Sequence, residues 1–176
     1  MKKSLKSVAI MLAIILVCGG LLAVLSDLLF VSDEERIQRA IDKIYDENVS
    51  LEQTLDASAY TLHEDIGVIK QAHLLDNGDY LVLSTGKKGY SNGTVSVYVS
   101  IENANGVATV KKVVQDSYTG QTLMSKLGGL YEKYSNKTSS DSVNEIVSGA
   151  TYSSTAVNNA VTIALQYAQA QISIGG

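Results

Sequence analysis

An unbroken run of apolar and small residues from Val8 to Leu25 constrains this chain most strongly. Its 18 residues would extend about 27 Å as an α-helix, close to the ~30 Å thickness of a hydrocarbon core. Continuing the run to Phe30 closes the remaining gap. The pattern therefore predicts a transmembrane anchor over residues 8–30, preceded by a short tail over residues 1–7.

Charges on the two sides of this run predict its orientation. Three lysines precede it, Lys2, Lys3 and Lys6, and acidic residues follow it, Asp27, Asp33, Glu34 and Glu35. Positive residues flanking a membrane helix remain on the cytoplasmic side. We therefore expect a single-pass protein of the cell membrane with its N-terminus in the cytoplasm and its remaining chain outside.

Two other interpretations of the run are a cleaved signal peptide and a lipoprotein signal acylated at Cys18. A cleavable apolar region is usually shorter and ends at small residues. Here apolar residues continue well past Cys18, and the bulky Val17 precedes it. An uncleaved anchor, with Cys18 as a small apolar residue of the helix, agrees better with the pattern.

Composition excludes several classes of partner and site. Removing the three N-terminal lysines from 14 basic residues leaves 11 against 18 acidic residues, a formal charge of −7, which argues against nucleic acid. Cys18 is the only cysteine, so neither a disulfide framework nor a cysteine metal site is expected. His63 and His73 lie ten residues apart without other ligand types nearby, which favours surface or internally bonded histidines over metal ligands.

The segment after the anchor has helical periodicity. Ser32 and Glu35 have the spacing of a capping box, and apolar residues then recur at helical spacing from Ile37 to Tyr45. We expect an amphipathic helical spacer over residues 31–60, followed by an extracytoplasmic domain over residues 61–176.

The period then changes to that of strands. Asp76–Asp79 is a hairpin signal, and Val95, Val97, Val99 and Ile101 alternate with smaller or more polar residues across Thr94–Ile101. Asn105-Gly106 turns the chain into another apolar run. These features predict an antiparallel meander of about four strands, with the valine face in the core and the other face wetter.

Helical spacing returns towards the C-terminus. Leu123, Leu127 and Leu130 predict a short or bent helix, since Gly128 and Gly129 weaken its middle. A polar loop over 135–142 and a final helix over about 154–172 follow. The expected fold class is α+β: a single N-terminal transmembrane helix followed by a small antiparallel-sheet domain with flanking helices.

The candidate site lies between the polar loop and the final helix, in the run from Glu145 to Thr155 (EIVSGATYSST). One interpretation is that Ser153, Ser154 or Thr155 simply caps the helix. Another is an anion site, because free N–H groups and the helix dipole at a helix N-terminus favour a phosphate. Gly149 and Ala150 would then let a bulky group approach the backbone.

This run resembles the flavinylation motif of the FMN-binding domain family, which includes the G subunit of Rnf electron-transport complexes and the C subunit of the sodium-pumping NADH:quinone oxidoreductase. The resemblance rests on Ser148-Gly-Ala-Thr-Tyr-Ser-Ser-Thr-Ala-Val157 followed by an Asn-Ala-Val helix. The Gly89-Tyr90…Gly93 stretch and the strand after it are also similar to the family. So is the order of tail, apolar helix and outward domain.

The resemblance implies a cofactor and its attachment point. In the family, a flavin transferase joins FMN by a phosphoester to the threonine of this motif, which by position is Thr151. The motif residues implied to surround the cofactor are Ser148, Gly149, Ala150, Ser153, Ser154 and Thr155, and the resemblance adds Tyr118, Thr119 and Gly120 as flavin contacts. Glu145 stands where the transferase-recognition motif more often has aspartate, and the family's Thr-Pro-Gly loop lacks its proline here.

The function implied is electron transfer, as a subunit of an Rnf-type, ion-translocating oxidoreductase with other integral membrane subunits as partners. An alternative is a stand-alone anchored FMN carrier serving an extracytoplasmic reductase or a surface electron-transfer chain. A flavin-free surface binding or structural module is the third possibility, in which the motif is only a helix cap.

Overall fold

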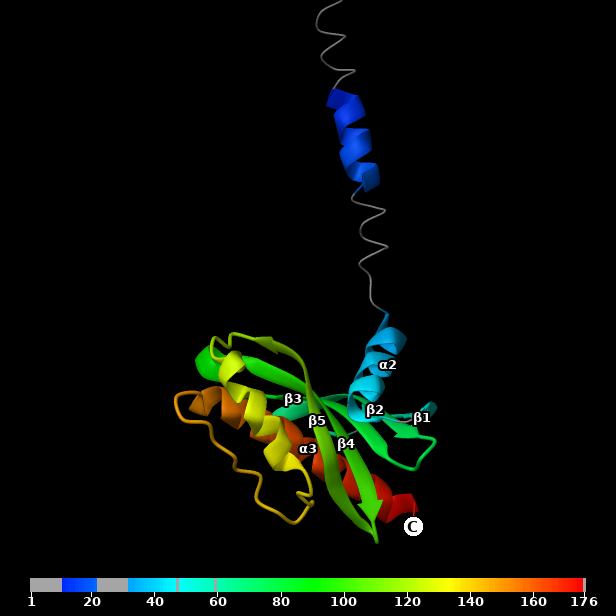
Figure 1. Cartoon of the computed structure of the whole chain (residues 1–176), viewed down its shortest axis with the longest axis vertical. Coiled ribbons are helices and arrows are strands. Elements are labelled where there is room, and N and C mark those ends of the chain that lie inside the picture. Colours follow the sequence, from blue (N-terminus) through cyan, green and yellow to red (C-terminus); the bar gives the residue numbers. More distant parts are fainter. Residues whose placement is uncertain (1–10, 22–31, 47, 59, 176) are drawn as a thin grey trace, which may run out of the picture. The chain divides into compact units, whose positions relative to one another are not determined.

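The computed structural model describes residues 11–21, 32–46, 48–58 and 60–175. The chain divides into two units, Met1–Ile37 and Gln38–Gly176. The second unit contains the sheet and the helices that follow it (Figure 1).

In the first unit, residues 11–21 are helical and exposed. Among the residues that the structure describes, no helix has the length and apolar character needed to cross a membrane. Most of the anchor predicted over residues 8–30 lies outside the described residues, as does the predicted tail over 1–7.

Helix α2 (Asp33–Ile44) begins as its capping signal predicts. The backbone N–H of Glu35 donates to the Ser32 side-chain oxygen at 3.2 Å, which satisfies one of the free donors of the first turn. The helical spacer predicted over 31–60 is nevertheless wrong in its extent. The helix stops at Ile44, and Leu51–Leu55 form strand β1.

The sheet has five antiparallel strands in the order β1-β2-β3-β4-β5, one more than the minimal meander predicted. The others are β2 (Gly67–Leu75), β3 (Tyr80–Gly86), β4 (Thr94–Ala104) and β5 (Val107–Thr119). The predicted turns are confirmed. Asn105 (φ 56°) and Gly106 (φ 88°) join β4 to β5, the left-handed pair that a tight hairpin requires.

Strand β4 is buried on both faces. Val95, Val97, Val99 and Ile101 are fully buried in the core, as predicted. The opposite face is not wetter, because Ser96, Tyr98 and Ser100 are also buried. Ser96 exchanges a 2.8 Å hydrogen bond with Thr85 of the neighbouring strand, which offsets the cost of burying both hydroxyls.

Helix α3 (Thr151–Gly175) lies across one face of the sheet (Figure 1). Ala156, Val157, Ala160, Val161 and Ala164 are buried in the same core cluster as the β4 valines. Small residues allow a close approach: a Cβ added at Gly86 would lie 1.8 Å from the carbonyl oxygen of Ala156. Ser84 also donates a 2.9 Å hydrogen bond to the Ala160 carbonyl. The start of α3 is thereby fixed against β3.

The segment predicted as a short or bent helix is the 3-10 helix η2 (Met124–Tyr134). Its buried residues Met124, Leu127 and Leu130 recur every third position, and three residues per turn is the period of a 3-10 helix. The polar loop that follows pairs with β5 through Thr109 and Thr138. Helix η2 and the polar loop thus connect β5 to the start of α3.

Candidate functional site

A pocket of about 240 Å³ lies at the start of α3. Three segments that are distant in sequence line it: the loop between β3 and β4, the turn after β5, and the residues around the α3 N-terminus. The lining residues are Tyr90, Thr122, Leu123, Gly149, Ala150, Thr151, Tyr152 and Ser153. The pocket thus brings together four predicted site residues, Gly149, Ala150, Thr151 and Ser153, with four that the sequence analysis did not assign to the site.

Helix α3 begins at Thr151, about three residues earlier than predicted. Gly149 has φ 76°, a conformation that reverses the chain direction and is cheap only for glycine. The N–H of Ser154 then donates to the Ala150 carbonyl at 2.9 Å, the first α-helical bond. Ser153, Ser154 and Thr155 therefore lie inside the first turns and do not cap the helix from outside.

This early start changes which backbone groups are available to an anion. In the described part of the chain, the N–H groups of Thr151, Tyr152 and Ser153 donate no hydrogen bond. The Ser154 N–H, by contrast, is already used. The free donors at the helix N-terminus are thus those of residues 151–153, earlier than a helix beginning near residue 154 would place them.

The four Ser and Thr side chains of the first turns differ in availability. Ser153 donates to Gln121 Oε1 at 2.7 Å, and Thr155 donates to the Thr151 carbonyl at 3.0 Å. Ser154 donates to the Ala150 carbonyl at 3.0 Å and accepts from the Val147 N–H. Thr151 is exposed, and its hydroxyl has no partner among the described residues. Thr151 alone therefore presents an unengaged hydroxyl at the pocket.

Gln121 joins the three segments of the pocket. This side chain is buried, with 7% of its surface exposed, and its Oε1 accepts from Ser153 Oγ and, at 3.2 Å, from the Tyr90 N–H. Its Nε2 donates to the Thr119 carbonyl at 3.3 Å. A single glutamine in a loop carries no sequence signal, so this residue could not be predicted.

The glycines upstream of β4 make room for Gln121. A Cβ added at Gly89 would lie 2.1 Å from Gln121 Nε2, and one added at Gly93 would lie 2.5 Å from it. The Gly89…Gly93 spacing noted in the sequence is therefore a packing requirement of the Gln121 amide. Such close approach is a common reason for glycine in a loop.

Thr119 and Gly120, predicted as flavin contacts, shape the turn and do not line the pocket. Thr119 Oγ1 bonds Thr94 Oγ1 at 3.0 Å, and Gly120 turns the chain with φ 65°. Their effect is to place Gln121 and Thr122 beside α3.

The remaining motif residues lie before the helix. Ser148 is exposed in a turn outside the pocket lining. Glu145 forms a 3.1 Å ion pair with Lys137, and its backbone N–H and carbonyl are both bonded by the Asn158 amide. Asn158 also accepts from the Tyr134 hydroxyl at 2.6 Å, and burial raises the pKa of that phenol. The Glu145 side chain is thus directed to Lys137 and is not part of the pocket.

The electrostatic surroundings of Thr151 favour an anion. The first turn of α3 contains no acidic residue, so the positive end of the helix dipole is not neutralised there. Lys126 on η2 approaches the same place: its Nζ lies 3.3 Å from the position of a Cβ added at Gly149. No ion pair engages Lys126 among the described residues.

The two histidines differ in their surroundings. Within the described residues no cluster of three potential metal-ligating side chains occurs. His73 is buried, its Nδ1 lies 3.2 Å from Thr54 Oγ1, and burial lowers its pKa. His63 is exposed. Both agree with the interpretation of one surface and one internally bonded histidine.

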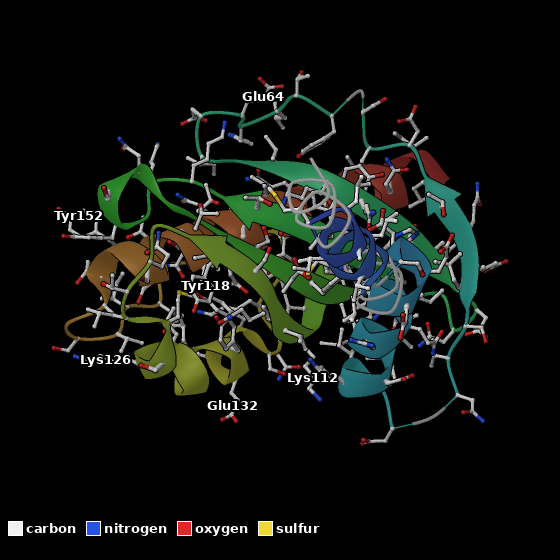
Figure 2. All side chains as sticks on the ribbon, turned by 90° about the horizontal axis from the view of Figure 1, so that it is seen from above. Glu64, Lys112, Tyr118, Lys126, Glu132 and Tyr152 are labelled. Carbon is white, nitrogen blue, oxygen red and sulfur yellow. The ribbon has the colours of Figure 1, made fainter. Side chains whose placement is uncertain are left out.

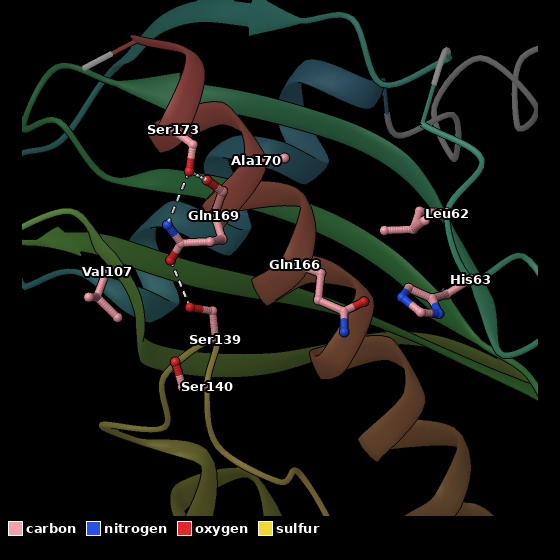
Figure 3. A pocket seen from close by; sticks show the side chains of 9 residues that line it. All are labelled: Leu62, His63, Val107, Ser139, Ser140, Gln166, Gln169, Ala170 and Ser173. Carbon is pink, nitrogen blue, oxygen red and sulfur yellow. Dashed lines mark hydrogen bonds between the residues drawn. The ribbon is translucent and has the colours of Figure 1, made fainter.

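His63 lines a second cavity of about 590 Å³ beside the C-terminal half of α3 (Figure 3). It shares no residue with the pocket at Thr151. Its central side chain, Gln169, is already engaged, since it accepts from Ser139 Oγ and the Ala108 N–H and donates to the Gly106 carbonyl. These bonds tie α3 to the β4–β5 hairpin and to the polar loop at Ser139.

The pocket at Thr151 lies within the part of the chain that matches a known family. Residues 89–166 match the FMN-binding domain family, a range that includes every residue lining the pocket at Thr151. No curated protein and no solved structure matches the chain significantly. Residues 89–166 of this chain are therefore an FMN-binding domain.

Proposed function

We propose that this chain is a membrane-anchored electron carrier whose FMN is bound covalently to Thr151 through a phosphoester. The family match supports a flavin-binding, electron-transfer role. One observation carries the choice of residue. Among the Ser and Thr side chains of residues 151–155, Thr151 alone is exposed, lines the pocket and has no partner within the described chain.

The residues at the start of α3 suit a phosphate group. The free N–H groups of residues 151–153 and the helix dipole would stabilise negative charge. Lys126 supplies a cation beside Gly149. A phosphoester at Thr151 would place its charge at these donors.

The pocket also fits only part of the cofactor. Its volume of about 240 Å³ is below the roughly 300–1,000 Å³ of sites that enclose a drug-sized ligand. When bound, FMN supplies one- and two-electron redox chemistry that no side chain of this site provides. A pocket too small to enclose the whole ligand would leave part of it accessible, which suits exchange of electrons with a partner protein.

The proposed attachment uses FAD as the donor and a flavin transferase as the catalyst. The Thr151 oxygen attacks the phosphorus of the FMN half, so that a new oxygen–phosphorus bond forms. The bond from that phosphorus to the bridging oxygen breaks, and AMP leaves with the electron pair. A base on the transferase takes the hydroxyl proton. No electron is gained or lost in this step.

We also propose that the domain lies outside the cell membrane, among other integral membrane subunits of an Rnf-type complex. The support is the resemblance in chain order and the lysines before the apolar run. Purification in mild detergent distinguishes the alternatives. Co-purifying membrane subunits support the complex, whereas a flavin-loaded chain that purifies alone supports the stand-alone carrier.

The attachment site is tested by co-expression with a flavin transferase, followed by denaturing gel fluorescence and peptide mass mapping across residues 145–166. We expect an FMN adduct at Thr151 in the wild type, none in Thr151→Ala, and partial attachment in Thr151→Ser. Thr155→Ala is the matched control, because it removes a threonine hydroxyl one turn along the same helix, and its adduct should persist. An adduct that survives in Thr151→Ala contradicts the site. An unmodified wild type, under conditions that flavinylate another family member, favours the flavin-free module.

A further inference from the structure

Two exposed tyrosines line the pocket at Thr151. Tyr90 has 52% of its surface exposed and Tyr152 has 63%. Their ring centroids are 6.3 Å apart with an interplanar angle of 64°, so the rings meet edge to face. Figure 2 shows Tyr152 projecting outward from the start of α3. Two exposed rings that border one pocket offer an aromatic surface to a ligand held there.

The fold holds the Tyr90 backbone in place. The Tyr90 N–H donates to Gln121 Oε1, the atom that also accepts from Ser153. The loop around it adopts positive φ at Lys88, Ser91 and Asn92 (67°, 51° and 58°). Non-glycine residues rarely adopt this conformation because it costs energy. The loop therefore holds Tyr90 beside α3 against a local backbone preference.

We propose that Tyr90 and Tyr152 form a wall on which the isoalloxazine ring of FMN stacks; the inference rests on the proposed attachment at Thr151. Tyr152 directly follows the attachment residue, and both rings border the same pocket as Thr151. The free amides and Lys126 receive the phosphate, which leaves the aromatic rings and Leu123 for the apolar end of the cofactor. Because the two rings are inclined by 64°, the flavin ring stacks with an offset on one of them and meets the other edge to face, the two favoured contacts between π-systems.

The wall has a spectroscopic consequence. A phenol ring stacked on an excited flavin donates an electron to it, and the electron then returns without net redox change. Flavin fluorescence is thereby quenched in the folded protein. Unfolding separates the rings while the covalent bond persists, so fluorescence recovers. The ratio of native to denatured fluorescence measures the stacking, and the denatured value alone measures attachment.

The experiment uses the full chain, loaded by co-expression with the transferase and purified in detergent. We expect Tyr152→Leu and Tyr90→Leu each to raise the native-to-denatured ratio by about twofold or more, because each variant removes one aromatic contact of the flavin ring. Because both side chains are exposed, these substitutions should leave folding unchanged. Tyr152→Phe keeps an aromatic ring but is a poor electron donor. It should raise the ratio while preserving the flavin absorption spectrum of the wild type.

Tyr60→Phe is the matched control. Tyr60 packs against Tyr167. Tyr167 lies roughly 22 Å along α3 from Tyr152, at 1.5 Å per residue. The Tyr60 hydroxyl has no hydrogen-bond partner among the described residues. Its ratio should equal that of the wild type. If both leucine variants carry flavin and have the wild-type fluorescence ratio, the proposed tyrosine wall is wrong, while the attachment at Thr151 is unaffected. A wild type without denatured flavin fluorescence overturns the attachment, and the wall with it.

Discussion

The hydroxyl side chains at the start of α3 show how single residues acquire different roles within one helical turn. Serine and threonine inside a helix can bond the carbonyl four residues earlier, and Ser154 and Thr155 do so with Ala150 and Thr151. Ser153 faces Gln121 instead. Thr151 has no carbonyl of the helix behind it, because the helix starts there. Its hydroxyl is consequently free for chemistry.

At this scale we predict a specific role for Lys126 in loading the cofactor. Lys126→Gln should slow flavinylation roughly two- to fivefold at low salt, since an exposed charge near a helix terminus has an effect of this size. The measurement is the time course of covalent fluorescence with purified transferase and FAD. The difference should shrink near 1 M salt, where charges are screened within about 3 Å.

Lys133→Gln provides the control for this prediction. Lys133 is an exposed lysine in the last turn of the same 3-10 helix, so the variant has the same change in net charge. Its loading rate should equal that of the wild type. Equal slowing by the two variants would indicate a general charge effect instead of a contact at Gly149.

At the scale of elements, the site depends on how closely α3 approaches the sheet. Gly86 ends β3 where the backbone of α3 passes, and a Cβ there would meet the Ala156 carbonyl at 1.8 Å and the Ala160 N–H at 2.6 Å. Helix backbone cannot rotate away as a side chain can. This contact therefore sets the distance between α3 and β3, and with it the position of the α3 N-terminus.

Gly86→Ala should destabilise the domain by about 1–3 kcal/mol or more, because the clash forces the helix backbone to move. Thermal unfolding of the full chain in detergent, followed by circular dichroism, measures the effect. Gly128→Ala makes the same chemical change in η2, where an added Cβ meets nothing within 4 Å. It should leave stability within about 0.5 kcal/mol. Equal melting temperatures for the two variants would contradict the proposed close approach.

At the scale of the whole molecule, the residue after α2 is bonded to the sheet. The Tyr45 hydroxyl donates to Asp79 at 2.7 Å and lies 2.6 Å from Ser100 Oγ. Lys111 pairs with the same carboxylate at 2.9 Å. Burial is the main cause that raises the pKa of Tyr45. Hydrogen bonds of Tyr45 thus hold the chain that follows α2 against the sheet.

The proposed anchor makes a prediction about the topology of the entire chain. Lys2, Lys3 and Lys6 favour a cytoplasmic N-terminus. A reporter enzyme that works only outside the cytoplasm should therefore be active when it is fused after Gly176, and a reporter that works only in the cytoplasm should be inactive there. Replacing these three lysines with glutamate is the control, and it should weaken or invert the orientation. A wild-type fusion that is active only as a cytoplasmic reporter would contradict the outward location. A mature protein beginning at a lipidated Cys18 would establish the lipoprotein alternative.

The sequence by itself determined the features that depend on local rules. Alternation across Thr94–Ile101 predicted β4, Asn105-Gly106 predicted the hairpin, and helical spacing predicted α2 and α3. The α+β class followed from these patterns, and the resemblance of the motif at Thr151 indicated the FMN-binding domain that residues 89–166 match. Such signals survive without tertiary context because period, turn conformation and motif are properties of adjacent residues.

Only the tertiary structure decided what depends on distant segments. Strand β1 has an exposed, non-alternating sequence and exists through its pairing with β2. The start of α3 was set by Gly149 and Ala150 instead of the hydroxyl residues that resemble caps. Gln121 acquired its role from Gly89, Gly93 and Ser153, contributed by two other segments. The pocket therefore exists only after the sheet has formed, because its three sides are brought together by long-range packing.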